Sequence, residues 1–172
     1  MRKLLIALLV LIIALAALVL YAHREALRGP IVRTATIKLP DWPAGAKPIR
    51  VVLISDLHID GQAMDEARLD RIVAQINALK PDIVLLAGDY IYGHDPVGAK
   101  KYGPGLVAPL SKLRAPLGVV AVLGNHDQWT GVGTVRAQLT QAGVTVLENE
   151  AVVRGPIAIG GVGDDLDRKS VV

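Results

Sequence analysis

The chain has 172 residues, of which 19 are Lys or Arg and 16 are Asp or Glu, so its formal net charge is +3. This length suits one domain with an appendage, and the slight basic excess is compatible with anionic substrates or lipid headgroups. Aromatic residues make up 3% of the chain and no basic run contains them, so nothing in it indicates a nucleic-acid partner. The absence of cysteine excludes disulfides, zinc–thiolate sites and thiol nucleophiles.

An apolar segment, residues 4–22, lies at the start of the chain. Spanning a bilayer takes about 20 such residues, so residues 1–23 are predicted to form a transmembrane anchor. A cleaved signal segment is the alternative, with the small residues at 14–16 (Ala-Leu-Ala) as its cleavage site. No helical phase has a polar face, which argues against a core helix of a soluble protein.

Basic residues flank this segment on both sides. Arg2 and Lys3 favour a cytoplasmic N-terminus, whereas Arg24 and Arg28 on the other side weaken that bias. We expect a single-pass protein of the cell membrane, with its domain on the extracytoplasmic side. Residues 24–47 are then a tether, in which 31–39 alternate between apolar and polar side chains and predict a half-exposed edge strand.

Three apolar, β-branched runs predict buried strands of a parallel sheet, at 50–55, 82–87 and 118–123. Between the first two, residues 65–80 have the period of an amphipathic helix, with Asp65 as its N-cap and Pro81 beyond its end. Such a strand–helix–strand unit implies parallel pairing and an α/β fold. We expect a loop over 90–105, then helices over 106–113 and 134–142, and short strands over 144–147, 151–154 and 157–160.

Each predicted buried strand is followed by residues that can bind metal ions. Asp56 and His58 follow the first strand, Asp89 the second and Asn125 the third. Ligands of open α/β sheets bind beyond the carboxyl ends of the strands, so these side chains are expected to converge. On an extended segment Asp56 and His58 point to the same side, Asp89 can bridge two ions, and Asn125 offers a neutral oxygen to the second ion. Mixed imidazole and carboxylate ligation suits Mn, Zn or Fe.

His126 and Asp127 are the candidate catalytic residues. The side chain of His126 is expected to point away from that of its neighbour Asn125. It can then donate a proton to a leaving oxygen or stabilise charge on phosphoryl oxygens. Asp127 is expected to orient the imidazole of His126.

Three further side chains flank this predicted site. Tyr90 and Trp129 either pack against a substrate or belong to the rim of the site. His94 is expected to be an exposed loop histidine rather than a metal ligand.

Taken together and in this order, the three clusters resemble the motifs of the calcineurin-like metallophosphoesterase family. The first cluster includes Asp56 and His58, the second is Gly88-Asp89, and the third is Gly124-Asn125-His126-Asp127. The membrane-anchored arrangement is similar to the bacterial YkuE/YaeI-like branch. The resemblance implies a two-sheet α/β sandwich flanked by helices and a dinuclear centre. In that centre Asp56 and His58 would hold the first ion, Asp89 would bridge, Asn125 would hold the second, and His126 would act on the phosphate.

The motifs of the family are incomplete in this chain. Protein serine/threonine phosphatases extend the second motif as Gly-Asp-x-x-Asp-Arg, whereas residues 88–93 read Gly-Asp-Tyr-Ile-Tyr-Gly, which disfavours that activity. The downstream Gly-His and Gly-His-x-His motifs do not occur, and no histidine follows Asp127. We therefore expect residues 48–172 to be the N-terminal part of a metallophosphoesterase domain, truncated at its C-terminus.

Two functional hypotheses follow from the sequence. The first is a metal-dependent hydrolase with two divalent ions, acting on phosphomonoesters, phosphodiesters or lipid-linked pyrophosphates. The second is a catalytically inactive fragment, or a membrane-tethered binding module, that lacks the C-terminal histidine ligands. A nucleotide-binding protein is disfavoured because residues 56–64 supply no glycine loop between the first strand and the first helix.

Overall fold

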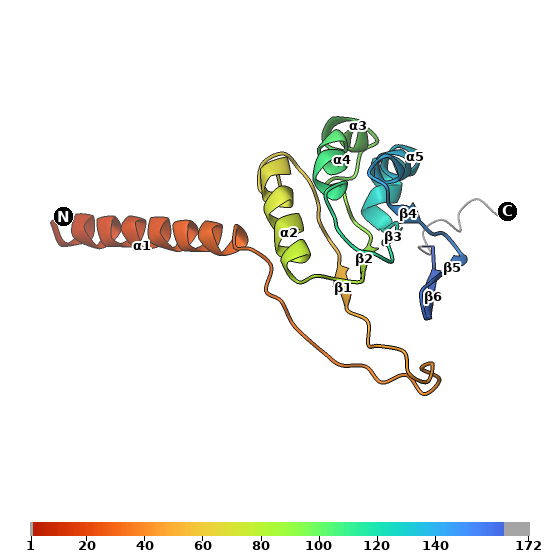
Figure 1. The fold of residues 1–172 in the computed structure, drawn as a ribbon. Helices are drawn as coiled ribbons and strands as arrows, with labels where there is room; N and C mark the ends of the chain where they lie inside the picture. The colour runs from red at the N-terminus through yellow and green to blue at the C-terminus, as the bar shows by residue number, and fades with distance from the viewer. Residues whose placement is uncertain (1, 164–172) are drawn as a thin grey trace. The chain divides into compact units, whose positions relative to one another are not determined.

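The computed structural model describes residues 2–163, and the chain divides into two units, residues 1–34 and 35–172 (Figure 1). The end of the predicted domain, residues 164–172, lies outside the described part.

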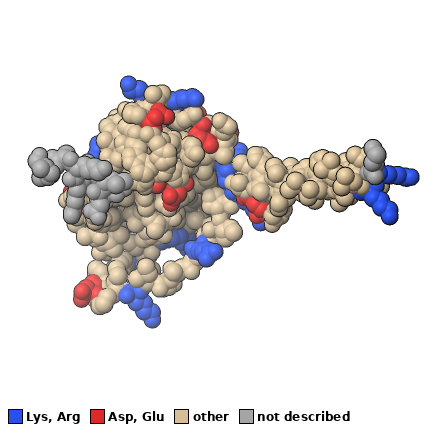
Figure 2. Space-filling model, turned by 180° about the vertical axis from the view of Figure 1, so that it is seen from behind, with Lys and Arg blue, Asp and Glu red and all other residues tan. Residues whose placement is uncertain are grey.

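The first unit contains α1 (Arg2–Ala26), a helix of 25 residues with none of them buried. At about 1.5 Å per residue it is roughly 38 Å long, which exceeds the ~30 Å hydrocarbon core of a bilayer. In Figure 2 its surface is mostly uncharged, with basic side chains next to its N-terminal end. Among the described residues α1 is the one helix long and apolar enough to cross a membrane, and a signal sequence passes the same test.

The predicted edge strand over 31–39 is wrong, because the structure has no strand there. Ile31 and Ile37, the apolar positions of the alternating pattern, are exposed. A period-two pattern fixes which face each side chain takes, but a strand also needs a neighbouring backbone edge to pair with.

The second unit is built on a parallel sheet with strand order β1-β2-β3-β4, which confirms the predicted α/β class and the parallel pairing. The strands are β1 (Val51–Ile54), β2 (Ile83–Ala87), β3 (Val119–Val122) and β4 (Thr145–Val146). Val52 lies opposite Val84, and Val84 lies opposite Val119. The carboxyl ends of the first three strands therefore meet at one edge.

Four helices accompany this sheet: α2 (Glu66–Ala78), α3 (Val97–Tyr102), α4 (Pro104–Leu110) and α5 (Asn125–Gln141). The N-cap of α2 is the predicted one, since the Asp65 carboxylate accepts from the amide of Arg68 at 2.7 Å. Two predictions were inaccurate. The expected loop over 90–105 contains α3 and the start of α4. In α5 a kink at Gly131 (φ 121°) joins two helical pieces: the second includes most of the predicted helix over 134–142, and the first, from Asn125, was not predicted. The third cluster therefore lies in the first turn of a helix.

The two faces of the sheet have different neighbours. Val84 and Leu86 of β2 belong to the main core, which the helices line, whereas Ile83 belongs to a smaller cluster on the other face. That second cluster packs against a hairpin of β5 (Glu150–Arg154) and β6 (Ile157–Gly161). The prediction that the first run forms a buried strand is wrong for the described part, because no residue of β1 is buried and Val51 and Leu53 are 42% and 67% exposed. The described part is therefore helices on one face of a sheet, with a small antiparallel hairpin on the other.

Candidate metal centre

The loops that follow β1 and β2 stay paired beyond the sheet. The amide of Asp56 donates to the carbonyl of Gly88 at 3.1 Å, and the amide of His58 donates to the carbonyl of Asp89 at 3.0 Å. An isolated parallel bridge continues this pairing. The Asp-x-His segment is therefore fixed along the Gly-Asp segment, where the strand ends were predicted to converge.

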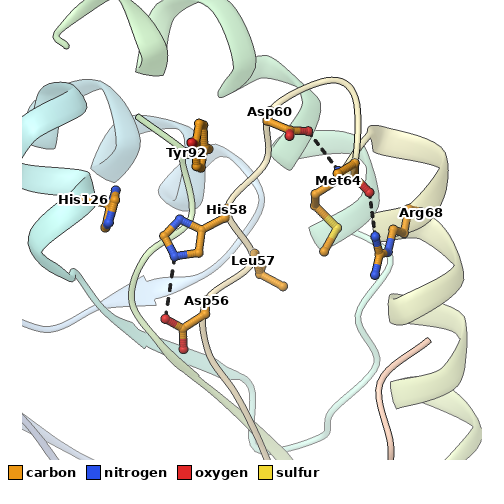
Figure 3. Close-up of a pocket in the computed structure, with 9 residues that line it drawn as sticks. Asp56, Leu57, His58, Asp60, Met64, Arg68, Tyr92 and His126 are labelled. Carbon is orange, nitrogen blue, oxygen red and sulfur yellow. Dashed lines mark hydrogen bonds and ion pairs between the residues drawn. The ribbon is translucent and has the colours of Figure 1, made fainter. Parts of the chain in front are cut away.

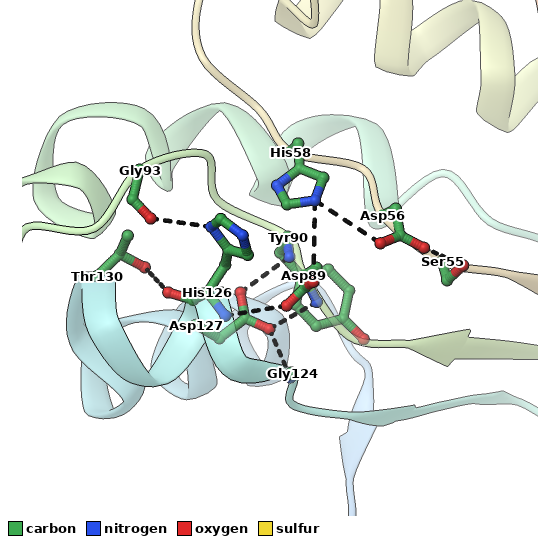
Figure 4. A network of polar contacts seen from close by, with 10 residues as sticks. All are labelled: Ser55, Asp56, His58, Asp89, Tyr90, Gly93, Gly124, His126, Asp127 and Thr130. Carbon is green, nitrogen blue, oxygen red and sulfur yellow. Dashed lines mark hydrogen bonds and ion pairs between the residues drawn. The ribbon is translucent and has the colours of Figure 1, made fainter. Parts of the chain in front are cut away.

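Four of the predicted site residues lie close together (Figure 4). The Nε2 atom of His58 lies 3.7 Å from Oδ1 of Asp56 and 3.8 Å from Oδ2 of Asp89. His58, Asp89 and His126 each offer a ligand atom, and these atoms lie within 4.8 Å of one another. Ligands ~2.0–2.2 Å from an ion stand roughly 3.4 Å apart when they are tetrahedral. The spacing and the mixed oxygen and nitrogen donors thus fit a divalent cation.

Three of these residues have left-handed backbone conformations. The φ angles are 56° for Asp56, 45° for His58 and 59° for Asp89. Residues other than glycine seldom adopt such angles, and those that do cluster at functional sites. Alternation along an extended strand was therefore the wrong reason to expect Asp56 and His58 on one side. Their side chains come together because the backbone turns at both positions.

Two glycines let the loops after β2 and β3 touch. A Cβ atom on Gly88, whose φ is +89°, would lie 2.7 Å from the backbone nitrogen of Gly124. A Cβ atom on Gly124 would lie 2.8 Å from the backbone nitrogen of Asp89. Contacts this short are repulsive. The close approach of the two backbones therefore requires glycine at both positions, in the second and in the third cluster.

Asp127 has a different role from the one predicted. Its buried carboxylate accepts from the amides of Asp89 (2.9 Å), Tyr90 (2.8 Å) and Gly124 (2.9 Å). It therefore links the two loops and does not orient the imidazole of His126. Burial raises the pKa of Asp127 above its ordinary value, and the three amide hydrogen bonds partly offset that rise.

His126 is held at two points. Its amide donates to Oδ1 of Asp89 at 3.0 Å, and its Nδ1 lies 2.9 Å from the carbonyl of Gly93. Because a carbonyl only accepts, Nδ1 carries a proton. Nε2 can then bind an ion when it is unprotonated, or donate to a phosphoryl oxygen when the ring is an imidazolium. No sequence signal pointed to the carbonyl of Gly93, since every residue has one.

The remaining candidates lie around His126. Asn125 is the first residue of α5, and its role as a ligand of a second ion stays a prediction. Trp129 packs against His126, with ring centroids 5.0 Å apart. His94 is exposed, as predicted, but its ring lies 4.9 Å from that of His126 and 4.7 Å from that of Trp129. The sequence did not reveal this aromatic contact to the site.

Tyr90 is a core residue, because its side chain is 1% exposed. Its hydroxyl lies 3.1 Å from the carbonyl of Leu86 and 3.0 Å from the carbonyl of Val122, so it joins the ends of β2 and β3. Burial is the main cause that raises the pKa of its phenol. The suggestion that Tyr90 packs against a substrate is therefore wrong.

Tyr90→Phe is expected to lower the free energy of unfolding by about 1–2 kcal/mol, because the carbonyls of Leu86 and Val122 lose the one O–H donor that they share. Denaturant unfolding measures this change. Tyr102→Phe, at a partly buried position, is the matched control and should cost less. Equal losses in the two variants would contradict the assigned contact.

The family profile of calcineurin-like phosphoesterases matches residues 49–162. The chain belongs to this family. The match covers β1 to β6, α2 to α5 and all the clusters of the site, so the resemblance seen in the sequence is confirmed. This calcineurin-like domain is accordingly of the metallophosphoesterase type, and its homologues are described as metallophosphoesterases.

The similar proteins include bacterial and animal metallophosphoesterases. An uncharacterized metallophosphoesterase of Aquifex aeolicus is 36% identical over 87% of this chain and 54% of its own length. YkuE of Bacillus subtilis is 31% identical over 75% of this chain and 45% of its own. A bovine transmembrane protein with a metallophosphoesterase domain is 32% identical over 74% of this chain and 28% of its own. The chain thus spans about half the length, or less, of these relatives.

Proposed function

We propose that this chain provides a metal-dependent hydrolase site for phosphate esters. The observation that carries the proposal is that the carboxylates of Asp56 and Asp89 lie 3.7 and 3.8 Å from Nε2 of His58 at the carboxyl ends of parallel strands, with the imidazole of His126 beside them. Phosphomonoesters, phosphodiesters and lipid-linked pyrophosphates are the proposed substrates. The alternative of an inactive fragment or binding module is an outcome of the experiment below.

The proposed cofactors are two divalent ions, Mn, Zn or Fe. Asp56, His58 and Asp89 would hold the first, and Asp89 and Asn125 the second. When bound, such a pair of ions polarises the phosphoryl group and activates water for in-line attack. The Gly93 carbonyl holds the ring of His126 through Nδ1–H, and in the imidazolium form Nε2–H donates to the leaving oxygen or to a phosphoryl oxygen.

The proposed organisation places the site at a cell membrane. Residues 1–23 are the anchor or signal segment, 24–47 the tether and 48–172 the N-terminal part of the phosphoesterase domain. The apolar surface of α1 supports membrane association. An extracytoplasmic location of the domain is part of the proposal.

The test is metal stoichiometry together with turnover, measured on the full chain in detergent micelles. We expect two Mn²⁺ ions per chain by calorimetry and metal-dependent hydrolysis of bis(4-nitrophenyl) phosphate, both abolished by chelation. One weakly bound ion or none, without turnover, would instead support the inactive fragment or binding module.

A further inference from the structure

A cavity of about 460 Å³ extends from the metal centre along the first loop (Figure 3). Asp56, His58 and His126 line one part of it. Pockets for small organic ligands have volumes of roughly 300–1,000 Å³, and a single phosphoryl group would fill only a fraction of this space. The cavity therefore has room for the group that is attached to the phosphate.

The middle of the cavity is apolar. Leu57, Ala63 and Met64 line it, and the ring of Tyr92 stands edge-on to the ring of His58 with centroids 6.3 Å apart. In Figure 3, Leu57 and Met64 lie between the imidazoles and Arg68. An apolar or aromatic group gains free energy by leaving water for such a lining.

The far end of the cavity carries the guanidinium of Arg68, the one Lys or Arg side chain among the described residues that line it. Its Nη1 donates to the carbonyl of Ala63 at 2.7 Å, which fixes the guanidinium against the loop before α2. Asp60 also lines the cavity, and its Oδ1 accepts from the amides of Gln62 (2.8 Å) and Met64 (2.9 Å), which closes that loop and offsets the negative charge of the carboxylate. A guanidinium in a fixed position favours carboxylate or phosphate groups.

We propose that this cavity binds the ester group of the substrate, and that this group is apolar or aromatic beside the phosphate and anionic at its far end. The anionic end is a carboxylate or a second phosphate, recognised by Arg68. This inference rests on the proposed phosphoesterase function and names the substrate class of the same site.

The experiment measures binding of non-hydrolysable phosphonates to the Mn²⁺-loaded full chain in micelles by calorimetry. The probes are methylphosphonate, phenylphosphonate, 4-phosphonobenzoate and 1,4-phenylenediphosphonate. Phenylphosphonate should bind about tenfold more tightly than methylphosphonate, and Met64→Ser should reduce that ratio. A second anionic group on the probe should raise the affinity about tenfold further. Comparing 4-phosphonobenzoate with 1,4-phenylenediphosphonate shows whether the cavity prefers a carboxylate or a phosphate-like group.

Arg68→Gln should remove the preference for the doubly anionic probes, and Arg68→Lys should restore part of it. Arg71→Gln is the matched control, because Arg71 is an exposed residue of the same helix and does not line the cavity. Equal affinities for phenylphosphonate and both doubly anionic probes would overturn the inference, as would a preference that survives Arg68→Gln.

Turnover of phenyl phosphate separates the two proposals. Turnover without any preference among the phosphonates means that the inference fails while the proposed function stands. Neither turnover nor phosphonate binding means that both fail.

Discussion

Asp89→Asn is expected to lower metal affinity and turnover together, each by at least about 100-fold, because Asp89 is the carboxylate shared by the proposed ions. The substitution removes the negative charge and preserves the local structure. Asparagine has the same shape, tolerates the left-handed φ of 59° at this position, and can still accept from the amide of His126. Calorimetry with Mn²⁺ and hydrolysis of an aryl phosphate diester measure the two effects.

Asp70→Asn is the matched control for that experiment. Asp70 pairs with Lys112 at 2.7 Å on the surface of α2 and takes no part in the site, so both readouts should stay unchanged. Intact turnover in Asp89→Asn would show that the bridging role is wrong.

His126→Ala completes the comparison, because it separates a ligand from a group that acts on the phosphate. We expect turnover to fall by about 10²–10³-fold while metal affinity stays close to that of the unchanged chain. His126 also lies within the 4.8 Å group of possible ligand atoms. A loss of metal as large as that in Asp89→Asn would therefore make His126 a ligand and contradict its proposed role.

Gly88→Ala is expected to destabilise the fold by about 3 kcal/mol or more, or roughly 10 °C in the unfolding midpoint. The new methyl group meets the backbone of Gly124 at 2.7 Å, and the residue must also keep a φ of +89°. Backbone atoms cannot rotate away as a side chain does, so the loops after β2 and β3 must separate.

Gly143→Ala isolates the two contributions, because Gly143 has a similar φ of +82° but nothing within 4 Å of an added Cβ. It should cost about 1 kcal/mol, from the left-handed conformation alone. A loss in Gly88→Ala no larger than this would mean that the two loops do not touch as described. Thermal unfolding followed by circular dichroism measures both variants.

Most of the fold could be predicted from the sequence, because apolar runs and helix caps are local sequence patterns. The continuous apolar runs that became β1, β2 and β3 are typical of parallel strands, although the burial expected from such runs is met only by β2 and β3. Asp65 marks its helix start by its own side chain. The strand over 31–39 failed for the opposite reason, since pairing depends on a neighbour that no local pattern reports. The early start of α5 was missed because Gly131, with a φ of 121°, interrupts the helical pattern there.

The site was predictable in its residues but not in its geometry. The positions of the clusters after the strands correctly predicted that Asp56, His58 and Asp89 are neighbours. The left-handed backbone conformations that bring their side chains together could not be predicted, because no residue type in the clusters signals them. Asp127 was assigned to the imidazole of His126 because the two are adjacent in sequence. Its three actual partners are backbone amides, two of which lie far away along the chain, and backbone groups carry no sequence signature.

The two carboxylates that flank His58 differ in freedom. The Asp89 side chain is 16% exposed and is held by the amide of His126, next to the segment that Asp127 clamps, whereas Asp56 is 64% exposed and is met by the hydroxyl of Ser55. The Asp89 side of the centre is thus held in one conformation, whereas the Asp56 side chain can change its conformation. We therefore expect exchange of an ion with bulk solvent to proceed on the Asp56 side, at a rate that depends on rotation of that single side chain rather than on opening of the loops.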